Sequence, residues 1–119
     1  MHIVIIDDES AVAETLAEAV RGQGHTAAIG RSGPEGLALL AEKTPDAVFL
    51  DLVMPGQSGV ELLREIRRGN PELPIVVVTG WARPQDLDEV RRIGVTDIVE
   101  KPWALKYVDE ALRTLGPTS

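Results

Sequence analysis

Short runs of apolar residues alternate along this chain with segments in which apolar residues recur every three or four positions. The runs predict buried strands, because β-branched and aromatic side chains pack well on a pleated surface. Two of them are β-branched at every position, which is typical of parallel strands buried on both faces. The predicted strands are Ile3–Ile6, His25–Ile29, Ala47–Leu50, Ile75–Val78 and Val95–Val99.

The segments between the strands, and one after the last strand, have the periodicity of amphipathic helices. The first four have favourable starts, with Ser10, Ser32 and Ser58 as expected N-caps and Pro84 in a first turn. Ser32 and Ser58 are each followed three residues later by Glu, which is the capping-box pattern. The expected inward positions are Val12, Leu16 and Val20, then Leu37, Leu40 and Ala41, then Val60, Leu63 and Ile66 or Arg67, then Leu87 and Val90, and finally Leu105, Val108, Leu112 and Leu115.

This alternation of strand and helix predicts an α/β fold with a parallel sheet and helices on both of its faces. A length of 119 residues suits a single domain with one core. The chain contains no internal repeat, low-complexity tract or linker. We therefore expect residues 1–119 to form one domain, with residues 116–119 as a tail.

Composition narrows the possible classes of function. The net charge of -7 provides no basic footprint for nucleic acid, so a cation or a basic protein surface is the more natural partner. The absence of Cys excludes disulfides and thiolate metal sites. The start of the chain lacks the pattern of a signal peptide, and no apolar segment approaches membrane-spanning length. We expect a cytoplasmic protein that contacts neither membrane nor nucleic acid directly.

Polar residues stand at the ends of four predicted strands. In a parallel sheet these ends meet at one edge, where ligands bind. The residues are Asp7 and Asp8 after the first strand, Asp51 after the third, Thr79 after the fourth and Lys101 after the fifth. Residues far apart in the sequence are therefore expected to converge, and this convergence is the main functional signal.

The three carboxylates would repel one another unless a cation lies between them. Mg²⁺ suits such a site, because it takes oxygen ligands and typically uses one or two carboxylates together with water and phosphate oxygens. We expect Asp8, Asp51 and the backbone carbonyl of Val53 as direct ligands, with Asp7 acting through water. The alternative for Asp7 and Asp8 is a solvated turn in which the helix dipole favours acids.

An aspartate can also act as a nucleophile and form an aspartyl-phosphate. Phosphoryl transfer needs positive charge and hydrogen-bond donors around the phosphoryl oxygens. Lys101 offers a point charge and Thr79 a hydroxyl. Each has a plainer alternative, since Lys101 would also serve as a counter-ion to the acids and Thr79 as an ordinary strand residue.

Four motifs, in order, carry a resemblance that covers nearly the whole chain: Ile3-Val4-Ile5-Ile6-Asp7-Asp8-Glu9, Phe49-Leu50-Asp51-Leu52-Val53-Met54-Pro55-Gly56, Val76-Val77-Val78-Thr79-Gly80 and Glu100-Lys101-Pro102. With them the chain resembles the response-regulator receiver domains of two-component signalling, including the chemotaxis receivers. The resemblance implies a flavodoxin-like three-layer sandwich, with a five-stranded parallel sheet in order 2-1-3-4-5 and five helices.

The resemblance also implies a function. Asp51 would accept a phosphoryl group from a histidine kinase or a histidine phosphotransfer protein, with Mg²⁺ required, and the Lys101–Pro102 bond would be cis. The docking surface that responds would lie around the fourth helix, fifth strand and fifth helix. Such a domain is a signalling switch rather than an enzyme, because it catalyses only its own phosphotransfer and dephosphorylation.

Three positions depart from the usual receiver pattern or tune it. Many receivers have Tyr or Phe three residues before the lysine, whereas this chain has Ile98, which has no ring or hydroxyl. The positions that control hydrolytic water in receivers are occupied by Val53 and Trp81. Neither side chain orients water well, so we expect slow self-dephosphorylation.

Other functions fit the sequence less well. A phosphohydrolase with an aspartate nucleophile would need an acid at the position of Val53. The complete set of site residues argues against a receiver that is never phosphorylated. A nucleotide-binding Rossmann domain is also disfavoured, because no glycine-rich phosphate loop follows the first strand. The sequence leaves open whether the chain stands alone, as a monomer or weak homodimer that docks on a downstream protein, or is part of a hybrid kinase or of a regulator with an attached output domain.

Overall fold

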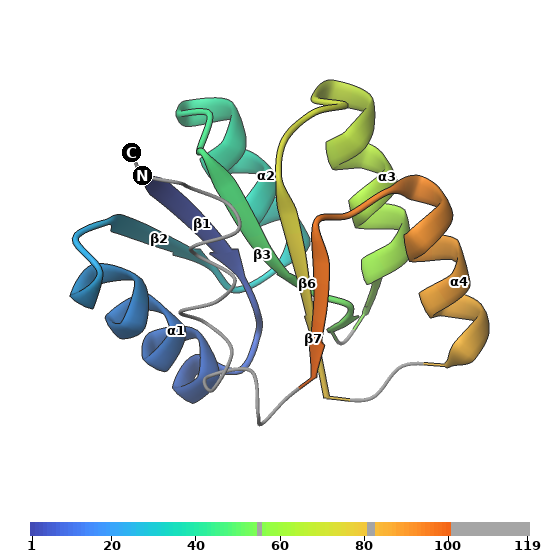
Figure 1. Cartoon of the computed structure of the whole chain (residues 1–119), viewed down its shortest axis with the longest axis horizontal. Coiled ribbons are helices and arrows are strands. Elements are labelled where there is room, and N and C mark those ends of the chain that lie inside the picture. The colour runs from blue at the N-terminus through green and yellow to red at the C-terminus, as the bar shows by residue number, and fades with distance from the viewer. Residues whose placement is uncertain (55, 81–82, 101–119) are drawn as a thin grey trace.

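The computed structural model describes residues 1–54, 56–80 and 83–100. Its main sheet contains five parallel strands: β1 (His2–Ile6), β2 (Thr26–Gly30), β3 (Ala47–Asp51), β6 (Ile75–Thr79) and β7 (Asp97–Glu100). They lie in the order β2-β1-β3-β6-β7, and Figure 1 shows their carboxyl ends directed toward one edge. Counted along the chain this is the order 2-1-3-4-5, so the predicted flavodoxin-like sheet is confirmed.

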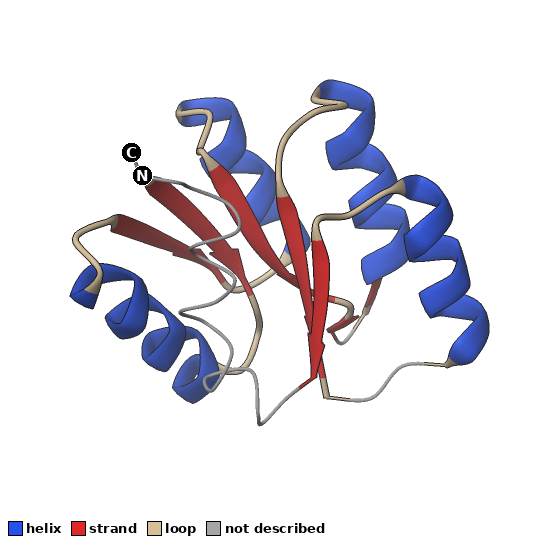
Figure 2. Ribbon diagram, viewed as in Figure 1, coloured by secondary structure: helices blue, strands red, loops and turns tan. Residues whose placement is uncertain are grey.

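Four helices flank the sheet in the part of the chain that the structure describes: α1 (Ser10–Gly22), α2 (Gly33–Glu42), α3 (Gly59–Gly69) and α4 (Pro84–Ile93). Figure 2 shows α1 on one side of the sheet and α2, α3 and α4 on the other. The predicted fifth helix lies outside the described residues. No helix within the described ranges has the length and apolar character needed to span a bilayer.

Successive residues of each strand enter different cores, because strand side chains alternate between the two faces of the sheet. Ile5 of β1 packs with Leu16 of α1 in one core. Its neighbour Ile6 packs with Leu63 of α3 in the other. The central strands β1, β3 and β6 are therefore buried on both faces, as their continuous apolar sequences predict, whereas the edge strands β2 and β7 are partly exposed.

The start of α1 differs from the prediction. Ser10 is the first helical residue, and Glu9 is the N-cap, without a side-chain hydrogen bond at that position. The Ser10 hydroxyl instead accepts a hydrogen bond from Arg31 Nε (3.1 Å). The predicted caps of the next two helices are confirmed, since the hydroxyls of Ser32 and Ser58 accept backbone hydrogen bonds within their first turns.

The inward face of α2 also differs. Its buried residues are Gly33 and Gly36, while Leu37 and Leu40 are partly buried and Ala41 is exposed. The backbone approaches the sheet closely here, because a Cβ atom on Gly36 would meet the Ile6 side chain. The periodicity of the leucines could not show that glycines make the closest contact.

A small antiparallel hairpin, β4 (Val53–Met54) and β5 (Gln57–Ser58), lies between β3 and α3. These two short strands are not among those predicted from the sequence. Gly56 has a φ of 73°, a left-handed conformation that glycine adopts without strain and that suits a tight hairpin turn. Pro55 lies outside the described residues. The hairpin therefore begins two residues after Asp51, at the edge where the polar strand ends meet.

Candidate functional site

Two carboxylates meet where neighbouring strands end. Asp51 is the last residue of β3, and Asp7 directly follows β1. The parallel register pairs Ile6 with Leu50, so Asp7 and Asp51 come next on the two adjacent strands. Both are almost completely buried, with 1% and 2% of their surfaces exposed. The topology thus places two acids side by side at the carboxyl edge of the sheet.

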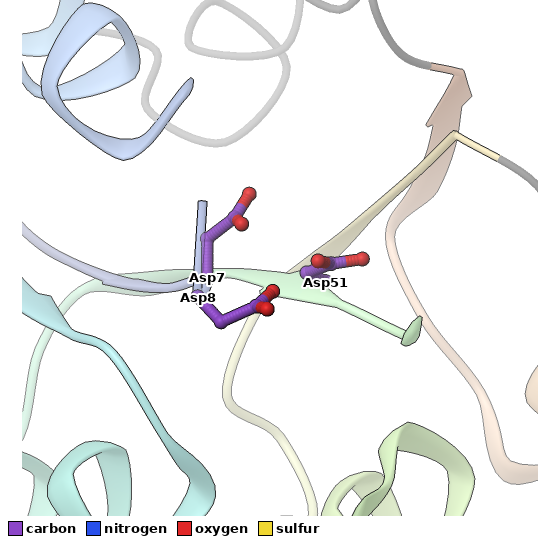
Figure 3. Close-up of side chains that lie close together, drawn as sticks. All are labelled: Asp7, Asp8 and Asp51. Carbon is purple, nitrogen blue, oxygen red and sulfur yellow. The ribbon is translucent and has the colours of Figure 1, made fainter. Parts of the chain in front are cut away.

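Asp8 completes an acidic cluster with these two residues. One carboxylate oxygen from each of Asp7, Asp8 and Asp51 lies within 4.8 Å of the other two. Figure 3 shows the three side chains gathered at the ends of β1 and β3. Asp8 is partly exposed, so the cluster reaches solvent on its side. Acidic oxygens at this separation match the ligand set of a hard divalent cation such as Mg²⁺, which would also offset their mutual repulsion.

The backbone after each strand orients the two buried carboxylates. Asp7 Oδ1 accepts a hydrogen bond from the Glu9 amide (2.9 Å). Asp51 Oδ1 accepts one from the Val53 amide (3.0 Å). In this Asx-turn pattern an aspartate side chain folds the chain that follows it. The direction of both carboxylates is therefore fixed locally.

The start of α3 supports the segment that follows Asp51. The Gly59 amide donates to the Leu52 carbonyl oxygen (3.2 Å). A Cβ atom on Gly59 would collide with the backbone of Leu52. Gly59 lies inside the predicted capping box that begins at Ser58, and that pattern says nothing of its contact with Leu52. A glycine in the first turn, where other residues form helices better, is the signal that could have predicted this close approach.

Thr79 lies at the same edge. It ends β6, one residue beyond Val78, which pairs with Asp51. Its side chain is 3% exposed, and Oγ1 has no hydrogen-bond partner among the residues that the structure describes. A buried hydroxyl without a partner costs about 1–3 kcal/mol, so it calls for an explanation. Donation to the oxygen of a ligand bound at the acidic cluster would provide one.

Two further predicted residues lie in described strands. Ile98 is partly buried in β7 opposite Val77, and both belong to the core shared with α3 and α4. Val53 begins the hairpin after Asp51, and 53% of its surface is exposed. An aliphatic side chain therefore faces solvent close to the acidic cluster, where a polar residue would be expected on solvation grounds alone.

Lys101 and Trp81 lie outside the described residues, as does the Lys101–Pro102 bond. The described part of β7 ends at Glu100, which pairs with Thr79 in the neighbouring strand. Lys101 follows Glu100 directly in the sequence. Its expected position at the carboxyl edge stays a prediction.

An ion pair between Arg64 and Glu89 ties α4, the next helix after Thr79, to α3. Arg64 hydrogen-bonds Glu61 within α3 and Glu89 across on α4, and Glu89 also pairs with Arg92 (2.9 Å). The hydrogen bond from Arg64 lowers the pKa of the Glu89 carboxyl and raises the pKa of Arg64 itself. These contacts orient α4 against α3 on the side of the sheet that holds Ile98.

Two hollows in the described part of the chain lie away from the acidic cluster. One of about 210 Å³ is lined by residues of α2 and α3, among them Leu40 and Ile66. Another of about 270 Å³ is lined by residues near the ends of α3 and α4, among them Arg67 and Ile93. Each helix returns the chain to the start of a parallel strand, so helix C-termini lie at the amino edge of the sheet. The hollows are therefore remote from the convergent polar residues.

The sequence matches the family described as "Response regulator receiver domain" over residues 3–113. It is similar to the transcriptional regulatory protein AfsQ1 of Streptomyces coelicolor, with 37% identity over 115 residues that cover 95% of this chain and 50% of AfsQ1. It is 35% identical over 117 residues to response regulator MprA of a Mycobacterium species, covering 97% of this chain and 50% of MprA. The chain thus spans about half the length of these curated relatives.

The fold is also similar to that of a solved receiver-domain structure. The receiver domain of NtrX from Brucella abortus superposes with a TM-score of 0.87 and 29% sequence identity. The match covers 98% of this chain and 99% of the NtrX domain. Sequence and fold therefore agree in the family that they indicate.

Proposed function

This chain belongs to the response regulator receiver domain family, a family of signalling switches, and on that premise we propose that it is the phosphoacceptor of a two-component phosphorelay. Asp51 receives the phosphoryl group from a histidine kinase or a histidine phosphotransfer protein. The observation that carries this proposal is the near-complete burial of Asp51 within 4.8 Å of the acids Asp7 and Asp8. One domain over residues 1–119, with a tail at 116–119, is part of the proposal.

In the transfer step a carboxylate oxygen of Asp51 attacks the phosphorus of the donor phosphohistidine. An O–P bond forms, the N–P bond breaks, and the donor imidazole keeps the electron pair of that bond. The Asx turn at Val53 holds the Asp51 carboxylate in a fixed direction (3.0 Å), which favours in-line attack because less freedom is lost at the transition state. The hydroxyl of Thr79 donates to a phosphoryl oxygen, and Lys101 supplies positive charge.

The acidic cluster fits Mg²⁺. Asp8, Asp51 and the Val53 carbonyl would be its direct ligands, and Asp7 would act through water. When bound, the cation offsets the negative charge of the carboxylates and of the phosphoryl oxygens. Without it, the three acids would repel an incoming phosphoryl group. Phosphorylation of Asp51 should therefore depend on Mg²⁺.

The docking surface proposed to respond comprises α4, β7 and the predicted final helix. Thr79 connects this surface to Asp51, since it pairs with Glu100 of β7 and precedes α4 in the sequence. Ile98 packs into the core that also contains Val90 of α4. In place of the rotation of an aromatic ring, repacking of this isoleucine would couple the site to α4.

The output partner is either a separate protein or an attached domain. AfsQ1 is named a transcriptional regulatory protein and is about twice as long as this chain. A regulator of that length would contact nucleic acid through its other half, because this chain is acidic with a net charge of -7. We propose a cytoplasmic receiver that is a monomer or weak homodimer by itself.

The deciding experiment is intact-mass spectrometry after incubation with Mg²⁺ and a small phosphodonor such as acetyl phosphate. We expect a single phosphoryl adduct that is absent from Asp51→Asn and absent when Mg²⁺ is chelated. A phosphorylated histidine protein serves as a second donor. If neither donor produced an adduct under conditions in which Mg²⁺ binds, the proposal would be wrong.

The exposed side chain of Val53 predicts slow hydrolysis of the aspartyl-phosphate, because it cannot orient a water molecule. Val53→Asn would supply that hydrogen bond and should shorten the phosphoryl lifetime roughly tenfold or more. Val53→Ala, which adds no polar group, is the matched control, and Trp81→Ala tests the second position that controls water. The decay of the mass adduct measures each lifetime, and an unchanged rate in Val53→Asn and Trp81→Ala would contradict this interpretation.

A further inference from the structure

The segment between β1 and α1 carries two of the three clustered acids, yet its helix begins without a side-chain cap. Glu9 occupies the N-cap position, and its side chain does not cap the helix. Its carbonyl accepts the first helical hydrogen bond, from Ala13 (2.9 Å). Within the segment, the Asx turn from the Glu9 amide to Asp7 Oδ1 (2.9 Å) spans Asp8. Contacts from the neighbouring strand end add to this local hold.

The end of β2 holds the segment on both sides of Asp8. Before Asp8, the Asp7 amide donates to the Gly30 carbonyl oxygen (3.0 Å). After Asp8, the guanidinium of the next β2-end residue, Arg31, donates from Nε to the Ser10 hydroxyl (3.1 Å). Asp8 therefore lies between two points that consecutive residues of the β2 end hold in place.

A second nitrogen of Arg31 extends the contact along α1. Nη2 donates to Glu14 Oε1 (3.0 Å), one helical turn beyond Ser10. The Arg31 backbone is itself anchored, because its amide donates to Glu35 Oε1 in the first turn of α2 (3.2 Å). One side chain thus joins the first turn of α1 to the corner between β2 and α2.

We propose that Arg31 is a positioning residue for the acidic site. It holds the start of α1 against the β2–α2 corner and so fixes Asp8 relative to Asp51. This inference rests on the proposed function and adds to it a residue that does not touch the ligand. Direct hydrogen-bond partners of metal ligands typically affect metal affinity by about 10–100-fold. Arg31 contacts Ser10 and Glu14 rather than a ligand, so we expect an effect at the lower end of that range.

A purely electrostatic role for Arg31 and a positioning role predict opposite changes in Mg²⁺ affinity when Arg31 is removed, so the direction of the change tests the inference. The chain has a net charge of -7, and removal of one cation makes it more attractive to Mg²⁺. A purely electrostatic role for Arg31 therefore predicts tighter binding in Arg31→Gln. A positioning role predicts weaker binding. The Arg31 and Glu14 side chains are 44% and 55% exposed, so loss of this ion pair should change the global stability little.

The test is a calorimetric titration of the full chain with Mg²⁺ alone. We expect Arg31→Gln to bind Mg²⁺ about tenfold more weakly than the parent chain, with a similar thermal unfolding midpoint. Arg31→Lys keeps the charge but has a single nitrogen for two acceptors, so it should restore part of the affinity. The matched control is Arg91→Gln, which removes the same charge and an exposed ion pair with Asp88 on α4.

Hydrogen–deuterium exchange without Mg²⁺ provides a readout that is independent of the metal. The amides of residues 9–13 should exchange faster in Arg31→Gln than in the parent chain or in Arg91→Gln. Affinity that is equal or tighter in Arg31→Gln, together with unchanged exchange, would overturn the inference while leaving the proposed function intact. If the parent chain itself bound no Mg²⁺, the proposed function would fall and the inference with it.

Discussion

The hydroxyl of Thr79 differs from the nearby carboxylates in its hydrogen bonding. Asp7 and Asp51 each accept a hydrogen bond from the chain that follows them. Thr79 Oγ1, by contrast, is buried without a hydrogen-bond partner in the described ranges. In the unphosphorylated chain, this hydroxyl therefore stabilises the fold no more than a methyl group in its place would. Its contribution is expected to arise when a phosphoryl oxygen arrives.

Replacement of Thr79 by valine therefore separates folding from function. Thr79→Val keeps the shape and removes the unsatisfied hydroxyl, so the free energy of unfolding should rise by about 1 kcal/mol. Phosphorylation by a small donor should slow by roughly tenfold or more, because a donor to the phosphoryl oxygens is lost. Denaturant unfolding and the rate of adduct formation measure the two effects.

The matched control for that variant is Thr96→Val, which changes an exposed threonine before the amino end of β7. It should alter neither quantity. Loss of stability in Thr79→Val, rather than a gain, would indicate that the hydroxyl is hydrogen-bonded in the folded chain and would remove the physical reason for assigning it to a ligand.

Among the elements, α3 is fixed at its C-terminal end by Arg67, near the amino edge of the sheet. Arg67 Nε donates to the Gly94 carbonyl oxygen (3.0 Å), and Nη1 donates to those of Asn70 (3.2 Å) and Leu73. Partial burial lowers the pKa of this guanidinium. One side chain thus joins the end of α3 to the loops that lead into β6 and β7.

Arg67→Met should lower the free energy of unfolding by about 2 kcal/mol, because hydrogen bonds from a charged donor are lost and partly buried carbonyl oxygens lose their partner. Affinity for Mg²⁺ should stay the same, since the acidic cluster lies at the opposite edge. Arg68→Met, at an exposed neighbouring position, is the control and should be nearly neutral. A variant that lost Mg²⁺ binding while keeping its stability would contradict this separation of the two edges.

The α3–α4 contact predicts a dependence of stability on pH. The pKa of Glu89 is lowered in the folded chain by its hydrogen bond from Arg64. The unfolded chain then binds more protons at acid pH, so this stabilisation is present above the ordinary value of 4.5 and disappears as the pH falls through the lower folded value.

Glu89→Gln should consequently be less stable than the parent chain near neutral pH, and the difference should shrink as the pH falls below 4.5. Denaturant midpoints across that range measure it, with Glu65→Gln, an exposed position on α3, as the control. Added salt should reduce the difference at neutral pH. A difference that stayed constant with pH would show that the Arg64–Glu89 pair does not stabilise the fold.

At the scale of the whole molecule, repulsion among the clustered carboxylates is expected to lower the stability of the metal-free fold, and a bound cation should offset it. Asp8→Asn removes one of three charges within 4.8 Å of one another, which should stabilise the metal-free fold by about 1 kcal/mol. Mg²⁺ should raise the thermal midpoint of the parent chain, because it binds only the folded state. Asp8→Asn should respond much less. Equal midpoints for the two proteins in chelator would argue against repulsion at the cluster.

The sequence predicted what depends on local pattern and on parallel topology. The apolar runs predicted the strands of the main sheet, and the ends of those strands predicted Asp7, Asp8 and Asp51 as one cluster. It missed the β4–β5 hairpin, since strands of two residues have no periodicity to detect. It placed the α1 cap at Ser10 and missed Arg31, because that contact joins residues 21 positions apart that only the folded chain brings together.

The alternation of side chains along β6 has a mechanical consequence. Val77 belongs to the core under α3 and α4, whereas Val78 belongs to the core under α1. Displacement of Thr79 along the strand would therefore strain the cores on both faces of the sheet, because Val77 and Val78 directly precede it. A ligand that displaced Thr79 would thus shift side chains on both faces of the sheet together, so the two helical layers would respond as one body.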